Sequence, residues 1–130
     1  MTPPAAARRV VLVRHPSVDE ACRGICYGAS DVGLSEAGQG EARAIAAQLA
    51  GWPLTQLFHS GLTRSRRCAE LIAQACGVPA IAAPALAEMN FGDWEMRTWD
   101  AIYAELPTAL ERLLAEPGTF APPRGETLYA

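Results

Sequence analysis

The sequence lacks any long hydrophobic run. No apolar stretch approaches the ~20 residues that a membrane-spanning helix needs. The N-terminal segment places Arg8 and Arg9 after its alanines, without the separate apolar region and cleavage site that are typical of a secretory signal. We therefore expect a cytoplasmic protein that has no membrane partner.

An excess of basic residues is missing too. The formal net charge is -3 over 130 residues, whereas nucleic-acid-binding proteins normally carry a basic face. Arginines are nevertheless grouped locally at Arg64, Arg66 and Arg67, which leaves room for a single anion site. The hydrophobic content of 50% is enough for a core, and we expect one domain over residues 1–130.

Paired cysteine motifs are absent, and histidine is scarce. The four cysteines are Cys22, Cys26, Cys68 and Cys76. None of them forms a CxxC pair, the spacing that is typical of zinc and redox sites. We therefore expect reduced thiols and no metal centre. The two histidines are His15 and His59, of which His59 is expected to be a strand residue with a satisfied hydrogen bond.

The first half of the chain predicts alternating strands and helices. The run VVLV at residues 10–13 is typical of a buried strand, and apolar residues from 34 to 49 recur at helical spacing after a candidate N-cap, Ser35. A short apolar run at residues 57–60 predicts the next strand. Strand, helix and strand form a βαβ unit, in which we expect parallel strands and a right-handed crossover.

The second half continues this pattern with weaker signals. A helix is predicted over residues 63–76, where Gly77 ends it, and a weak strand over residues 78–83. Leucines from 106 to 114 mark a helical stripe that is interrupted near Pro107. The predicted fold class is α/β, a three-layer αβα arrangement with a mostly parallel sheet.

Polar residues follow the first two predicted strands. Arg14 and His15 come directly after the first strand, and Ser60, Thr63 and Arg64 follow the second at the start of a helix. The loops after parallel strands share one edge of the sheet. Helix N-termini attract anions, and guanidinium groups match phosphate oxygens. The pattern predicts a phosphate pocket that contains an imidazole.

Such a pocket suits phosphoryl transfer. A neutral imidazole, here His15, can attack phosphorus and form a phosphohistidine. Arginines disfavour the imidazolium form and stabilise the equatorial oxygens. Glu88, after the third strand, is a candidate proton donor for the leaving group. Its position alone leaves open that it is a surface carboxylate.

Three motifs in order carry a family resemblance. The stretches LVRHP, SGLTRSRRCAELI and LAEMNFGDWE resemble the successive motifs of the histidine phosphatase (phosphoglycerate mutase-like) superfamily. The resemblance implies that His15 is the phosphorylated nucleophile, that Arg14 and Arg64 bind phosphate, and that Glu88 donates the proton. It implies no metal and no organic cofactor, and the partner that it implies is a small-molecule phosphate ester.

Within the superfamily, the stretches GICYGASDVGLSEAG, FGDWEMRTWDAI and FAPPRGET most resemble α-ribazole phosphatases, which act late in cobalamin assembly. This resemblance places four residues on the substrate side: Tyr27, Gly28, Ala29 and Ser30. Trp94 and Trp99 are expected to pack around the Glu88 loop, and Glu95 to have a structural or solvent role. The sequence leaves a homodimer open.

The chain departs from the family pattern in three places. Pro16 stands where the family usually has glycine, and Gly61 stands where it has proline. The second essential histidine of the family, on a late strand, has no counterpart. We therefore expect a C-terminally incomplete version of a longer domain, without the family's C-terminal strand and helix. The alternative is a naturally short, inactive relative.

Three functions follow from this pattern. The first is phosphomonoester hydrolysis, with α-ribazole 5′-phosphate as the best guess for the substrate. The second is a phosphoglycerate mutase-type or broad-specificity sugar phosphatase, although the short run from Glu88 to Trp99 favours a phosphatase over a mutase. The third is a catalytically inactive phosphate-binding or interaction protein, which the missing second histidine would favour.

Overall fold

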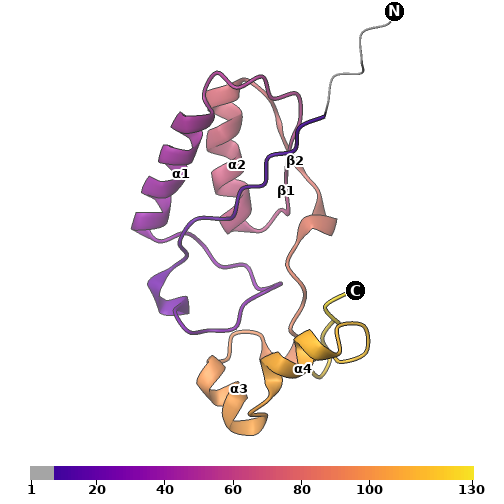
Figure 1. Ribbon diagram of the computed structural model, residues 1–130. Coiled ribbons are helices and arrows are strands. Elements are labelled where there is room, and N and C mark those ends of the chain that lie inside the picture. The colour runs from indigo at the N-terminus through magenta and orange to yellow at the C-terminus, as the bar shows by residue number, and fades with distance from the viewer. Residues whose placement is uncertain (1–7) are drawn as a thin grey trace, which may run out of the picture.

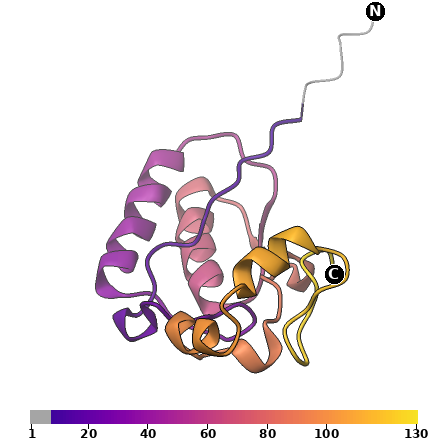
Figure 2. The ribbon, with the colours of Figure 1, turned by 60° about the horizontal axis from the view of Figure 1, so that its bottom comes forward.

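The computed structural model of the chain describes residues 8–130 and shows two long helices beside a small parallel sheet, with two short helices at the other end of the molecule (Figure 1). The helices and strands, in chain order, are α1 (Glu36–Leu49), β1 (Leu57–His59), α2 (Thr63–Cys76), β2 (Ala80–Ala82), α3 (Trp99–Glu105) and α4 (Ala109–Ala115). Single 3-10 turns occupy Glu20–Cys22, Pro84–Leu86 and Gly92–Trp94. Helices α1 and α2 run side by side in both Figure 1 and Figure 2.

The parallel βαβ unit consists of β1, α2 and β2. Its register pairs Leu57 with Ala80 and Phe58 with Ile81. Helix α2 provides the crossover and packs on both strands. The alternation of a strand sends Leu57 into the core beside α2, whereas Phe58 faces the opposite side and is half exposed. The predicted α/β class with a parallel sheet is confirmed.

The strand predicted over residues 10–13 is wrong. These residues pair with neither β1 nor β2, the two strands of the sheet within residues 8–130. The side chains of Val10 and Leu12 are 81% and 91% exposed. A strand needs hydrogen-bonding neighbours as well as apolar side chains, and this segment has none in the part of the chain that the structure describes. The βαβ unit therefore lies one strand later than the sequence predicted.

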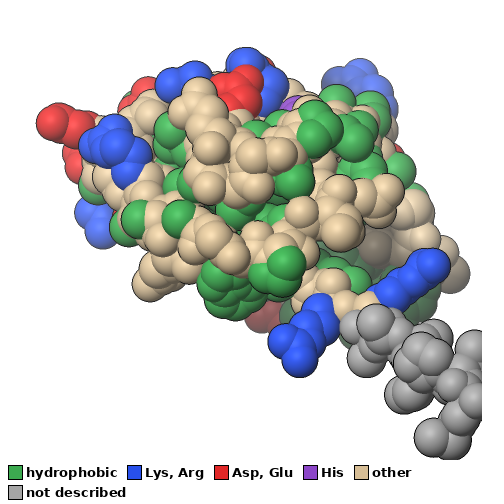
Figure 3. All heavy atoms as spheres, turned by 90° about the horizontal axis from the view of Figure 1, so that it is seen from above, with side chains coloured by type: hydrophobic (Ala, Val, Ile, Leu, Met, Phe, Trp, Pro, Cys, Tyr) green, Lys and Arg blue, Asp and Glu red, His purple; other side chains and the backbone are tan. Residues whose placement is uncertain are grey.

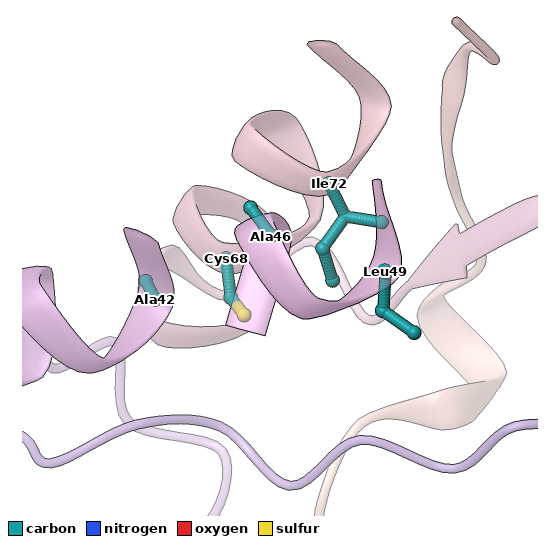
Figure 4. Packing of buried hydrophobic residues seen from close by; sticks show 5 residues of the cluster. All are labelled: Ala42, Ala46, Leu49, Cys68 and Ile72. Atoms are coloured by element: carbon teal, nitrogen blue, oxygen red, sulfur yellow. The ribbon is translucent and has the colours of Figure 1, made fainter. Parts of the chain in front are cut away.

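Helix α1 begins where the sequence predicted. The hydroxyl of Ser35 accepts a hydrogen bond from the Gly38 N–H at 3.0 Å, which satisfies one of the free donors of the first turn. Small side chains then recur at helical spacing and allow α2 to approach closely. Figure 4 shows the resulting core, in which residues of α1 meet residues of α2. The labelled residues are Ala42, Ala46, Leu49, Cys68 and Ile72.

Helix α2 has the predicted boundaries, Thr63 to Cys76. Gly77 ends it in the left-handed conformation, with φ of 69°, which glycine adopts without steric cost. Its N-cap residue, Leu62, has no side chain that can accept a hydrogen bond from the first turn. The carboxylate of Asp31, from the long loop before α1, takes that role by accepting from the N–H of Thr63 at 2.7 Å.

A second core lies around α3 and α4, at the bottom of Figure 1. It is built from Cys26, Trp94, Ile102 and Ala109, with further aromatic side chains packed against them. The rings of Trp94 and Trp99 meet edge to face at a centroid distance of 6.3 Å. The packing role that the sequence predicted for both tryptophans is confirmed.

The surface carries exposed apolar side chains. Phe58 and Ile81 are about half exposed on the face of the sheet that α2 does not cover. Figure 3 shows hydrophobic side chains among uncharged ones over the end of the molecule seen from above, with charged groups near its rim. Within residues 8–130, no helix is long and apolar enough to cross a bilayer.

Candidate functional site

A pocket of about 320 Å³ opens beside the segment that follows residue 13. It is lined by Arg14, His15, Pro16, Ser17, Val18, Tyr27 and Glu41. Arg14 is exposed and His15 half-buried, whereas Pro16 is buried and anchors the segment. The structure thus brings three of the predicted site residues, Arg14, His15 and Tyr27, to the wall of one pocket.

The imidazole of His15 is held in one tautomer. Its Nδ1 lies 2.8 Å from the carbonyl oxygen of Pro16. A carbonyl only accepts hydrogen bonds, so Nδ1 must carry the proton, and in the neutral ring Nε2 keeps its lone pair. The ring of Tyr27 lies beside it, at a centroid distance of 6.3 Å. In the neutral form of this ring, Nε2 is therefore the nitrogen that is chemically able to act as a nucleophile.

Helix α1 fixes the backbone just after His15. The carbonyl oxygen of Ser17 accepts from the N–H of Ser35 at 3.0 Å, and the carboxylate of Glu41 accepts from the N–H and hydroxyl of Ser17 at 3.0 and 2.8 Å. The hydrogen bond from the Ser17 N–H, and to a smaller extent the one from its hydroxyl, hold the pKa of Glu41 below its ordinary value. Glu41 is a pocket residue that sequence reasoning missed, because its partner lies 24 positions away.

Arg64 is buried, with 3% of its surface exposed. Its Nη2 donates to the carbonyl of Gly28 at 2.6 Å and its Nη1 to that of Ser30 at 2.8 Å. The guanidinium carbon lies 4.9 Å from the centroid of the Tyr27 ring, as in a cation–π contact. Arg64 and His15 thus both lie against Tyr27, although Arg64 does not line the His15 pocket.

Arg64 is a buried cation whose hydrogen-bond acceptors are neutral carbonyls. No carboxylate within residues 8–130 forms an ion pair with it. Burying a charge without a counter-ion is costly, so a site of this kind favours an anion.

The start of α2 was predicted to help bind that anion. In the structure an internal carboxylate is already there, because Asp31 accepts from both the N–H and the hydroxyl of Thr63, at 2.7 and 3.0 Å. These Thr63 donors are therefore committed to the protein itself. Asp31 ties the long loop to α2.

Glu88 lies away from the His15 pocket. It is exposed, and its carboxylate accepts from the N–H of the next residue, Met89, at 3.0 Å. It lines a separate hollow of about 460 Å³. The other residues of that hollow are Pro84, Ala85, Ala87, Met89, Glu126, Leu128 and Ala130. The structure does not bring the predicted proton donor to the predicted nucleophile.

Glu95 has the densest set of hydrogen bonds in this region. Its carboxylate accepts from the N–H groups of Gly28, Ala29, Ser30 and Phe91, at distances of 2.8 to 3.3 Å, and from the Ser30 hydroxyl at 2.6 Å. Burial acts to raise the pKa of Glu95, but these hydrogen bonds outweigh it and hold the pKa below its ordinary value. The structural role predicted for this residue is confirmed, and its extent was not foreseen.

The remaining histidine and the cysteines have structural surroundings. The Nδ1 of His59, which is buried, accepts from the N–H of Gly61 at 3.0 Å, as expected of a satisfied strand histidine. All four cysteines are free. Burial, with a smaller effect of the Glu95 charge, raises the pKa of Cys26 to about 12. Within residues 8–130 no group of three potential metal ligands is found.

Comparison with known proteins places this geometry in context. Residues 10–130 match the sequence profile of the histidine phosphatase superfamily, branch 1. The chain is 35% identical over 121 residues to a probable phosphoglycerate mutase GpmB of Erwinia tasmaniensis, covering 92% of this chain and 56% of the relative. It is 37% identical over 89 residues to the adenosylcobalamin/alpha-ribazole phosphatase of Salmonella typhimurium, covering 68% of this chain and 44% of the relative.

Solved structures agree with the sequence relatives. Mycobacterial glucosyl-3-phosphoglycerate phosphatase superposes with a TM-score of 0.79 at 29% identity, over 87% of this chain and 53% of that one. The chain spans about half the length of the curated relatives it matches.

Proposed function

Because this chain belongs to the histidine phosphatase superfamily, we propose that its site hydrolyses phosphomonoesters through a phosphohistidine on His15. The observation that carries the proposal is the hydrogen bond of Nδ1 to the Pro16 carbonyl at 2.8 Å. This hydrogen bond keeps the ring proton on Nδ1, away from the nucleophilic nitrogen, and fixes the direction of Nε2. A free imidazole must find both the tautomer and the orientation for itself.

The reaction has two steps. In the first, the lone pair of Nε2 attacks phosphorus, the bond from phosphorus to the ester oxygen breaks, and the leaving alkoxide takes up a proton. In the second, water attacks the phosphohistidine and gives a proton back to the group that donated one in the first step, the P–N bond breaks, and inorganic phosphate leaves while the neutral imidazole is restored. Arg14 and Arg64 stabilise the charge on the equatorial phosphoryl oxygens in both steps.

We assign the proton donor to Glu88, on its position in the motif LAEMNFGDWE. It lines the hollow that Glu126 also lines, not the His15 pocket. The assignment therefore requires the leaving group to extend from one hollow toward the other, or the segment that carries Glu88 to move. Replacement of Glu88 by glutamine tests it, because loss of a proton donor slows esters with poor leaving groups more than it slows p-nitrophenyl phosphate.

The substrate that we propose is α-ribazole 5′-phosphate, which would give the protein a role in cobalamin biosynthesis. The support comes from the relative named for that activity and from Tyr27, an aromatic ring on the pocket wall against which a flat base or sugar can pack. Tyr27 begins the segment to Ser30 that we place on the substrate side. A second candidate class is phosphoglycerate esters, since the names of other relatives refer to them.

A panel of phosphomonoesters tests the proposal. Release of inorganic phosphate is measured from α-ribazole 5′-phosphate, 3-phosphoglycerate and p-nitrophenyl phosphate, with the wild-type protein and two histidine variants. We expect His15→Ala to abolish turnover and His59→Ala to retain it whenever the variant is folded. Equal turnover by the wild type and His15→Ala would refute the assignment of the nucleophile.

A further inference from the structure

We propose that Glu95 is a positioning residue, whose carboxylate sets the orientation of the Arg64 guanidinium at the phosphate site. This inference rests on the proposed function. Glu95 does not touch the His15 pocket, and it acts through the three residues Gly28, Ala29 and Ser30. The geometry that supports it has two halves, one on each side of that tripeptide.

The first half is the carboxylate side. The N–H groups of three consecutive residues, 28 to 30, converge on the two oxygens of Glu95, at distances of 2.8 to 3.3 Å. The Ser30 hydroxyl adds the shortest bond, at 2.6 Å. Successive amides that point to one anion form a concave nest, which the Glu95 carboxylate occupies here. A carboxylate more than sixty positions away thus fixes the conformation of a loop without regular secondary structure.

The second half is the arginine side. The carbonyl oxygens of Gly28 and Ser30 accept from the two terminal nitrogens of Arg64, at 2.6 and 2.8 Å. Because the amide groups of the tripeptide are fixed by Glu95, the carbonyls between them are fixed as well. The planar guanidinium is held by two acceptors in a defined plane, and Tyr27 lies against it at 4.9 Å.

The loop is also closely packed against the segment that precedes Glu95. A Cβ atom on Gly28 would lie 2.0 Å from the Met89 carbonyl oxygen and 2.6 Å from the Phe91 ring. The backbone at Gly28 is therefore pressed between Arg64 and the segment that precedes Glu95. The carboxylate of Glu95 also accepts a hydrogen bond from the N–H of Phe91, at 3.0 Å. Glu95 therefore contacts both the Gly28 loop and the segment that packs against it.

The substitution Glu95→Gln isolates the effect. Glutamine has the same shape, but its amide NH₂ group is a donor and would face backbone N–H groups that are also donors. We expect the affinity for inorganic phosphate, measured by calorimetry, to fall about tenfold to a hundredfold, as small misplacements of binding groups do. The KM for p-nitrophenyl phosphate should rise in parallel. The matched control is Glu105→Gln, which removes an ion pair to Arg97 between two residues that do not line the pocket, and it should leave both values unchanged.

A double-mutant cycle separates positioning from general damage. If Glu95 acts through Arg64, Glu95→Gln should weaken phosphate binding in the wild-type background and add nothing in the Arg64→Ala background. Equal weakening in both backgrounds would overturn the inference, as would no weakening in either. If Glu95→Gln does not fold, Ser30→Ala removes only the 2.6 Å bond and takes its place in the cycle.

One outcome separates this inference from the proposed function. If the folded wild-type protein binds no phosphate and releases none from its esters, the proposed function fails. The N–H resonances of the Arg64 guanidinium still report its orientation. A shift or broadening of these resonances in Glu95→Gln, absent in Glu105→Gln, supports the positioning role, and unchanged resonances overturn it.

Discussion

Two glycines of helix α1 should respond in opposite ways to replacement by alanine. Gly38 and Gly40 both lie inside the helix, and alanine favours a helix by about 1 kcal/mol over glycine. Their surroundings differ. A Cβ on Gly40 would have as its nearest neighbour the flexible end of Arg43, at 3.9 Å, whereas a Cβ on Gly38 would lie 1.9 Å from the carbonyl oxygen of Ser17.

The size of the destabilisation by Gly38→Ala follows from the contacts that the Ser17 carbonyl would lose. To reach ordinary contact it would have to retreat by more than 1 Å. That movement breaks its hydrogen bonds from the N–H and hydroxyl of Ser35, now 3.0 and 3.3 Å long, which are worth about 1 kcal/mol each. Residual overpacking costs about 1–3 kcal/mol. After the gain in helix propensity, Gly38→Ala should destabilise the fold by about 2 kcal/mol or more.

Urea unfolding followed by tryptophan fluorescence measures both variants. We expect Gly40→Ala to stabilise the protein by about 0.5–1 kcal/mol. For a slope of about 1–3 kcal/mol/M, the midpoints of the two variants should then differ by about 1–3 M, on opposite sides of the wild type. Ser17 follows His15 by two positions, so Gly38→Ala should also impair phosphate binding. Equal stabilisation by both substitutions would show that the helix and the His15 segment do not make the close contact described.

Three other properties of the chain can be measured directly. Met96 has a φ of 62°, which glycine adopts more easily, and its side chain is half exposed. Met96→Gly should therefore raise the free energy of unfolding by up to about 1 kcal/mol, as measured by thermal unfolding. A loss of stability would contradict this. Because the pKa of Glu95 in the folded protein lies below its ordinary 4.5, its ionised carboxylate stabilises the fold above pH 4.5, and this stabilisation is lost on acidification. The difference in unfolding free energy between the wild type and Glu95→Gln should therefore shrink below pH 4.5. A difference that does not change with pH would contradict this. Cys26 is fully buried and has a pKa of about 12, so maleimide at pH 8 should label Cys76 before Cys26 in the native protein. Peptide mass mapping measures the order of labelling. The reverse order would refute the burial of Cys26.

Local signals were enough to predict the two long helices. The N-cap at Ser35 and the terminating Gly77 act within a few residues of the helix ends that they define, and both ends lie where the sequence placed them. The weak strand predicted over residues 78–83 is confirmed as the shorter β2. In each case the information lies within one turn of helix or one strand.

The strand predicted over residues 10–13 shows the limit of such signals. Its apolar composition is typical of a buried parallel strand, yet burial and pairing depend on neighbours that composition does not identify. The exposed Val10 and Leu12 have no such neighbours within residues 8–130.

The candidate site divides in the same way. Arg14 and His15 are adjacent in sequence and line one pocket, whereas Arg64, which the sequence placed in the same pocket, does not line it. The contacts of Glu95 with Gly28 and of Asp31 with Thr63 span 67 and 32 positions. No periodicity or motif spacing indicates which amides a distant carboxylate will meet, so these two residues could be recognised only in the fold.

The most direct test of the central claim is the location of the phosphoryl group during turnover. The wild-type protein is mixed with a slowly hydrolysed phosphomonoester, quenched at alkaline pH to preserve phosphohistidine, and mapped by peptide mass spectrometry. The account predicts one acid-labile phosphoryl group on His15 and none on His59. A phosphoryl group on any other residue, or turnover with no phosphorylated peptide even under rapid quenching, would contradict it.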